Sequence, residues 1–202
     1  FDGKSSNHNI LHRGANLTKM GQPGTFHSVG SGWANAGNTP WRLYKHFNHE
    51  GGIASPGIVH WPKGLAKKRR NAIERRPVHI IDVLPTFAAL AGIRSPYIKA
   101  LPGRSLLPVL DGKTVSVRPL FFEHEGNRAA RLGKWKLVAL AGQPWELYDF
   151  EADRTEMHNL ATDFPETVKK LVTLWEDWAD KNQVTPLPND YGVGYLKVKI
   201  KH

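Results

Sequence analysis

The feature that most constrains the fold is a series of four short strand-like runs followed by one amphipathic helix. The runs cover residues 119–124, 128–131, 134–140 and 146–150, and Gly126, Gly133 and Gly142 lie between them. Short runs separated by glycine turns are typical of an antiparallel meander. Residues 165–181 then place five apolar side chains on one helical stripe: Val168, Leu171, Val172, Trp175 and Trp178. The sequence therefore predicts a small α+β subdomain in which this helix packs on a four-stranded sheet.

The first half of the chain has a different pattern. Residues 53–61 read as a short buried strand with Pro56 at its edge. Residues 82–91 read as a helix, because Asp82 can cap its start and Gly92 can end it. Pro85 would lie in the first turn of this helix, where proline is tolerated. The helix would have an apolar face formed by Leu84, Phe87, Ala88 and Ala91.

The remaining segments show weaker signals. Residues 1–40 are polar and show no apolar period, so they are predicted to be loop, and a short helical turn is expected near residues 105–110. The fold class predicted from the whole chain is α/β. Residues 1–116 form the end of an α/β domain, residues 117–185 form the small subdomain, and residues 186–202 form a tail.

Charge and composition narrow the partners. The formal net charge of +10 favours an anionic partner, which could be nucleic acid, an anionic polysaccharide or a small anionic ester. The basic run K-K-R-R-N-A-I-E-R-R at residues 67–76 contains no aromatic residue for base stacking, so a solvated loop is favoured over a nucleic-acid patch. The absence of cysteine excludes disulfides, thiolate zinc sites and cysteine nucleophiles from these residues. No apolar run reaches the ~20 residues of a membrane helix.

Residues 41–53, W-R-L-Y-K-H-F-N-H-E-G-G-I, gather charged side chains before a double glycine. Gly51 and Gly52 permit a close backbone approach. Lys45 could bind a tetrahedral oxyanion as a compact point charge, or it could be a solvated surface lysine. His46 and His49 do not complete the three or four protein ligands that zinc requires, so no metal site is predicted from this chain alone.

Residues 123–131, E-H-E-G-N-R-A-A-R, form a second dense segment. Arg128 and Arg131 offer forked donors for an anionic group, and His124 and Asn127 could add hydrogen bonds. The alternative interpretation is a hairpin turn with ordinary surface charges.

Five segments, in their order and spacing, resemble type I sulfatases of the alkaline-phosphatase-like superfamily. Residues 30–53 resemble the late active-site segment, and residues 77–92 resemble the helix that follows it. Residues 103–112, 121–138 and 145–156 resemble the arylsulfatase C-terminal subdomain, so the resemblance spans about residues 1–185. It implies the C-terminal part of a sulfatase domain and a sulfuric ester hydrolase acting on sulfate monoesters, such as a sulfated small molecule or polysaccharide.

The resemblance also implies roles for particular residues. Lys45 matches the active-site lysine that binds the substrate sulfate and is the expected catalytic residue. His49, in the same segment, is also expected to bind the substrate. His124, Asn127 and Arg128 match the part of the subdomain that leans over the active-site mouth, where they would recognise the rest of the substrate. The family further implies a calcium ion and a formylglycine nucleophile.

The chain departs from the family pattern in two respects. The C/S-x-P/A-x-R motif that yields formylglycine is absent, and so are the Asp-Asp and Asp-Asn pairs that bind calcium. We therefore expect these groups upstream of Phe1, in a remainder of the sulfatase domain that this chain needs as its partner. The 202-residue chain alone is expected to be inactive. A periplasmic or secreted location is expected, because family members are often found there.

Three rival functions remain open. A phosphodiesterase or phosphonate hydrolase of the same superfamily would carry Thr where a sulfatase carries Cys or Ser. A non-catalytic fragment would only bind anions. A nucleic-acid binder would show a steep salt dependence, but we expect neither a nucleic-acid nor a membrane partner.

Overall fold

The computed structural model describes residues 30–184, which belong to two compact units. Among these residues, one unit joins 30–55 with 121–184, and the other contains Pro56–Leu120. The predicted tail at residues 186–202 lies outside the described residues. The predicted division assigns residues 1–116 to the end of a larger α/β domain, 117–185 to the subdomain and 186–202 to the tail. This division stays a prediction.

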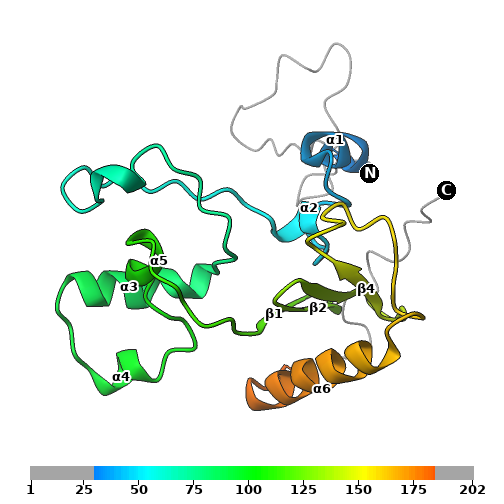
Figure 1. Cartoon of the computed structure of the whole chain (residues 1–202). Coiled ribbons are helices and arrows are strands. Elements are labelled where there is room, and N and C mark those ends of the chain that lie inside the picture. The colour runs from blue at the N-terminus through cyan, green and yellow to red at the C-terminus, as the bar shows by residue number, and fades with distance from the viewer. Residues whose placement is uncertain (1–29, 185–202) are drawn as a thin grey trace, which may run out of the picture. The chain divides into compact units, whose positions relative to one another are not determined.

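A four-stranded sheet forms the centre of the first unit (Figure 1). Its strands are β1 (Leu120–His124), β2 (Asn127–Leu132), β3 (Trp135–Ala139) and β4 (Glu146–Asp149), in the order β1-β2-β3-β4. The pairs β2–β3 and β3–β4 are antiparallel. The predicted meander is confirmed.

The turn between β1 and β2 contains only Glu125 and Gly126. Both have positive φ, 54° and 80°, as in the type I′ turn that matches the twist of a hairpin. Glycine adopts this conformation readily, whereas a glutamate there is uncommon.

Helix α6 (Pro165–Lys181) packs on one face of the sheet (Figure 1). Leu171 and Trp175 bury against Leu137 and Leu147 in one apolar cluster, and Trp135, Trp145 and Trp178 pack around it. The indole of Trp175 also donates a hydrogen bond of 3.1 Å to the carbonyl of Phe122. The predicted helix and its apolar stripe are confirmed.

The segment at residues 30–55 contacts the opposite face of the sheet through Arg42, His49 and Glu50. It contains α1 (Gly30–Asn38) and α2 (Glu50–Ile53), and α2 lies on the side away from α6 (Figure 1). The loop prediction for residues 1–40 is wrong for residues 30–38, and residues 1–29 lie outside the described residues. Helix α1 is mostly exposed, and Trp33 is 76% exposed. Because the helix buries no apolar stripe, its sequence shows no apolar repeat of 3.6 residues that would predict it.

The second unit contains short helices joined by loops. They are η2 (Lys67–Arg69), η3 (Ile80–Asp82), α3 (Val83–Leu90), α4 (Pro96–Lys99) and α5 (Leu107–Leu110). Helices α3 and α5 confirm the predicted helix and the predicted helical turn. No helix among the described residues is long and apolar enough to cross a membrane.

Two details of the α3 prediction are wrong. Asp82 does not cap α3 with its side chain, because its carboxylate accepts from the backbone amides of His79 and Arg104 and pairs with Arg118. The expected apolar face is also largely exposed: Phe87 is 62% exposed, whereas Ala88 is buried.

The predicted buried strand at residues 53–61 is wrong. Ile53 is the last residue of α2, and residues 54–60 are exposed coil, with Ile58 94% exposed. A strand needs a neighbour that pairs with its backbone N–H and C=O groups. The four strands of the described residues all lie between residues 120 and 149, and they pair with one another.

Candidate functional site

The loop that carries Lys45 folds back onto the double glycine of α2. The amide of Gly51 donates to the carbonyl of Arg42 over 2.9 Å. A Cβ added to Gly51 would overlap the carbonyls of Arg42 and Leu43, and one added to Gly52 would overlap the carbonyl of Phe47. The close approach predicted for the glycine pair is confirmed, although the pair lies in a short helix and does not lead into a strand.

A buried charge cluster of Lys136, Glu50 and Glu156 fastens α2 to the sheet. The Lys136 ammonium lies 3.2 Å from Glu50 Oε1 and 2.7 Å from Glu156 Oε1, and all three residues are at most 3% exposed. Glu156 Oε2 also accepts the backbone amide of Glu50 over 2.9 Å. Because a buried charge is costly unless it is paired, these three residues fix α2 in one position.

A second network holds the start of the same loop. Arg42 Nη1 donates to Glu146 Oε2 (3.2 Å) and to the hydroxyl oxygen of Tyr148 (2.7 Å), and Tyr148 donates to Glu146 over 2.5 Å. His49 Nε2 lies 3.2 Å from Glu146 Oε2. Burial alone would raise the pKa of Glu146, but the hydrogen bonds from His49 and Tyr148, with the charges of His49 and Arg42, lower that pKa to about 2. Glu146 is therefore ionised and holds Arg42 and His49 from β4.

Lys45 is exposed on this anchored loop. Its side chain makes no hydrogen bond or ion pair within residues 30–184. The loop on which it lies is fixed at Arg42 and at His49, so the position of its backbone is set while its ammonium group faces solvent. His49, predicted as a substrate ligand, is completely buried and contacts Glu146.

Asn127 joins the β1–β2 hairpin to the Lys45 loop. Its side-chain amide nitrogen donates to the backbone carbonyls of His46 (2.7 Å) and His124 (3.0 Å), and its backbone carbonyl accepts from the side chain of Asn48 (2.7 Å). The side chain of His124 is half exposed at the end of the hairpin. The structure therefore brings His124 and Asn127 to the loop that carries Lys45.

Arg128 lies on the other face of the sheet. Its guanidinium stacks over Trp145 at 4.5 Å and near Trp175 at 5.7 Å, and burial lowers its pKa. It faces α6, whereas the Lys45 loop covers the opposite face. Its predicted role in substrate recognition has no support from this placement and stays a prediction.

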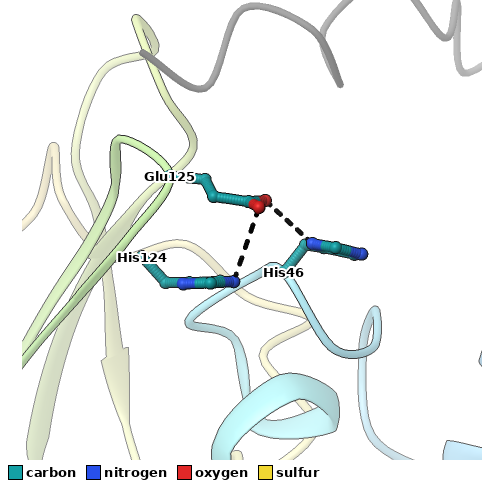
Figure 2. A group of neighbouring side chains, drawn as sticks. All are labelled: His46, His124 and Glu125. Atoms are coloured by element: carbon teal, nitrogen blue, oxygen red, sulfur yellow. Dashed lines mark hydrogen bonds and ion pairs between the residues drawn. The ribbon is translucent and has the colours of Figure 1, made fainter. Parts of the chain in front are cut away.

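His46, His124 and Glu125 form a cluster that sequence reasoning did not find (Figure 2). Glu125 Oε2 lies 2.8 Å from His46 Nδ1, and Glu125 Oε1 lies 3.8 Å from His124 Nε2. The two histidines are 78 residues apart in the sequence, so no local pattern joins them. The signal that could have found the cluster is the histidine beside a hairpin turn in E-H-E-G.

The basic run at residues 67–76 is held by contacts inside the second unit. Glu74 pairs with Arg69 at 2.8 Å and with Arg76 at 2.6 Å, and Arg70 donates to the carbonyl of Pro62. The hydrogen bond from Arg76 lowers the pKa of Glu74 to about 2, against the opposing effect of burial. These arginines hold a loop in place rather than form a stripe of free cations.

A four-stranded antiparallel sheet backed by one helix, with the Lys45 loop on its other face, is consistent with the C-terminal subdomain of a sulfatase. Residues 39–182 match a family described as N-sulphoglucosamine sulphohydrolase, C-terminal. The chain belongs to this family and corresponds to the C-terminal portion of sulfatases of the alkaline-phosphatase-like superfamily. The resemblance drawn from the sequence is confirmed.

Similar proteins agree with this family. An uncharacterized sulfatase of Schizosaccharomyces pombe is 32% identical over 199 residues, which cover 90% of this chain and 35% of the relative. The N-acetylgalactosamine-6-O-sulfatase of Bacteroides thetaiotaomicron is 28% identical over 160 residues, covering 69% and 30%. The crystal structure of Ps i-CgsB superposes with a TM-score of 0.60 at 25% identity, covering 79% of this chain and 36% of that chain. The chain spans about a third of the length of these relatives.

Proposed function

We propose that this chain is part of a sulfuric ester hydrolase that cleaves sulfate monoesters, with Lys45 as its sulfate-binding residue. The observation that carries this proposal is the exposed Lys45 on a loop held on both sides by Glu146, through the partly buried Arg42 and the buried His49. Membership of the sulfatase family supports the reaction class. The subdomain formed by the sheet and α6 would then serve substrate recognition.

The role of Lys45 follows from the charge of a sulfate ester. The ester carries one negative charge over its free oxygens, and charge shifts to the leaving oxygen as the S–O bond breaks. An ammonium group held nearby stabilises these oxygens, and it does so most effectively when its support does not reorganise during the reaction. The contacts of Arg42, His49 and the double glycine supply that fixed support.

Sulfated carbohydrate is the substrate class we propose. One relative is named for a sulfated N-acetylgalactosamine, and Ps i-CgsB has been crystallised with k-i-k-neocarrahexaose. The net charge of +10 favours such an anionic substrate. His124, half exposed on the hairpin, is the proposed contact to the sugar, whereas the buried His49 and Asn127 would act through the backbone that they hold.

The family also implies calcium and formylglycine, and the described residues do not fit either group. Calcium takes six to eight oxygen ligands, but the cluster of ligand-type side chains within residues 30–184 contains two imidazoles and a single carboxylate. The chain contains no cysteine, and no serine lies in the required motif. We propose that residues outside this chain supply both groups. The periplasmic or secreted location also stays a prediction.

The test is Lys45→Ala in the protein that contains the complete sulfatase domain. With a small aryl sulfate, we expect kcat to fall by roughly 10²–10³, the scale for one preorganised donor. Lys170→Ala is the matched control, because Lys170 is an exposed lysine on α6 and should leave turnover unchanged. Wild-type kcat in Lys45→Ala would refute the assigned role.

The same preparation separates the rival functions. If kcat/KM is higher for a phosphate diester or a phosphonate monoester than for the aryl sulfate, the protein is a hydrolase of phosphorus esters and not a sulfatase. A complete protein that binds sulfate esters but turns over none of these substrates would identify a non-catalytic anion binder. If the 202-residue chain alone turns over aryl sulfate, the proposal that the nucleophile lies outside this chain is wrong.

A further inference from the structure

We propose that His46, His124 and Glu125 form a binding site for a divalent transition-metal ion of the zinc type, at the contact between the Lys45 loop and the β1–β2 hairpin. Figure 2 shows the carboxylate of Glu125 between the two imidazole rings. The donor atoms of the three side chains all lie within 4.8 Å of one another. This inference does not depend on the proposed sulfatase activity.

The distances suit a small metal ion. Zinc binds imidazole nitrogen at about 2.0–2.1 Å and carboxylate oxygen at about 2.0–2.2 Å, so two tetrahedral ligands lie about 3.4 Å apart. The two separations from the Glu125 oxygens, 2.8 Å to His46 and 3.8 Å to His124, lie on either side of this value. The side chain of His124 is half exposed, so its ring can turn to close the longer separation.

The donor set selects the class of metal. Two imidazoles and one carboxylate favour zinc and its neighbours over calcium or magnesium, which prefer oxygen ligands. Three protein ligands also leave a fourth position for water or for an oxygen of a bound molecule, as in open zinc sites. The cluster therefore differs in chemistry from the calcium site that the family implies.

The backbone around the cluster is held in place. His46 and Glu125 have positive φ values of 95° and 54°. Residues other than glycine seldom adopt positive φ, and those that do are concentrated at ligand-binding and active sites. The buried amide of Asn127 donates to the carbonyls of both His46 and His124. Two ligands that are distant in sequence are thus fixed by one shared side chain, which is the support that a metal site requires.

The experiment is a Zn²⁺ titration of the 202-residue chain after removal of metal by a chelator, followed by calorimetry and by metal analysis after dialysis. His124→Ala and Glu125→Gln each remove one ligand, and circular dichroism checks that both variants are folded. His158→Ala is the matched control. Its imidazole lies 3.6 Å from Asp153 and is exposed, so it is a histidine–carboxylate pair for which residues 30–184 offer no third ligand nearby.

We expect one tightly bound Zn²⁺ in the wild type and in His158→Ala, and an affinity lower by at least about tenfold in both ligand variants, since loss of even an outer partner of a metal ligand costs 10–100-fold. An excess of Ca²⁺ should not displace the zinc. Equal affinities in all four proteins, no binding in the wild type, or displacement by equimolar Ca²⁺ would each overturn the proposal. A failure of sulfatase activity would leave this result untouched, because the titration measures binding alone.

Discussion

Replacing Lys136 by Met tests whether the buried charge cluster fixes the Lys45 loop to the sheet. Methionine has a volume close to that of lysine, so the contact near the Phe150 ring is kept while the charge is removed. Glu50 and Glu156 then remain buried without the cation that lies 3.2 Å and 2.7 Å from them in the wild type. Breaking a buried pair by removing one partner costs about 3–5 kcal/mol, so we expect the free energy of unfolding to fall by that amount.

Urea unfolding followed by tryptophan fluorescence measures this cost, because Trp135, Trp145, Trp175 and Trp178 report on the core of the first unit. With an m-value of about 2 kcal/mol per M, the midpoint should fall by about 2 M urea. Lys134→Met is the control: Lys134 also pairs with a carboxylate, Asp149 at 2.6 Å, but its side chain is 41% exposed, so its loss should cost at most about 1 kcal/mol.

A rescue experiment separates charge from packing. Adding Glu50→Gln and Glu156→Gln to Lys136→Met removes the two uncompensated charges and keeps an acceptor for the amide of Glu50. We expect the triple variant to be more stable than Lys136→Met alone, a non-additivity that contacts within one network produce. A cost below 1 kcal/mol for Lys136→Met, or no recovery in the triple variant, would refute the view that this cluster holds the loop.

Two further predictions concern the same loop. Gly52→Ala should lower the free energy of unfolding by about 1–3 kcal/mol, because the new Cβ overlaps the carbonyl of Phe47. Gly37 in α1 has open space around it, so Gly37→Ala should raise that free energy by about 0.5–1 kcal/mol. Equal effects of the two substitutions in urea unfolding would contradict the packing argument. Glu146 has a pKa of about 2 in the fold against 4.5 in the unfolded chain, so its contribution of about 3 kcal/mol is present above pH 4.5 and is lost as the pH falls toward 2. The stability difference between the wild type and Glu146→Gln should therefore shrink over that range, and a constant difference would exclude the ionised Glu146 as the anchor.

The elements that the sequence predicts correctly are those whose pattern is local. The four strands and α6 alternate or repeat with the period of their own backbone, and glycine marks the turns, as at Gly126. The strand prediction for residues 53–61 is wrong because it rests on local composition alone. A strand also depends on a neighbouring strand, and no local pattern shows whether that neighbour is present. Helix α1 was missed because an exposed helix needs no apolar stripe.

The candidate site was predictable only in part. Lys45 and the close approach of Gly51 and Gly52 follow from one short segment, so the sequence pointed to them. The partners of that segment did not follow, because Lys136 and Asn127 contact it across about 80 residues of chain. Lys136 did carry a signal, since a lysine within the apolar run of β3 must find a buried counter-charge.

The arrangement of these contacts links stability to function in the first unit. Helix α6 covers one face of the sheet through apolar packing. The other face carries a smaller apolar cluster of Ala129, Val138, Tyr148 and Phe150, and the Lys45 loop is joined to that side through charges and hydrogen bonds. Apolar packing tolerates small shifts, whereas the second type of contact depends on distance and direction. The directional contacts on the Lys45 side are therefore the ones that can place an ammonium group at a defined position. A change that loosens Lys136 or Glu146 should consequently reduce the fixed placement of Lys45 before it unfolds the helix side of the sheet.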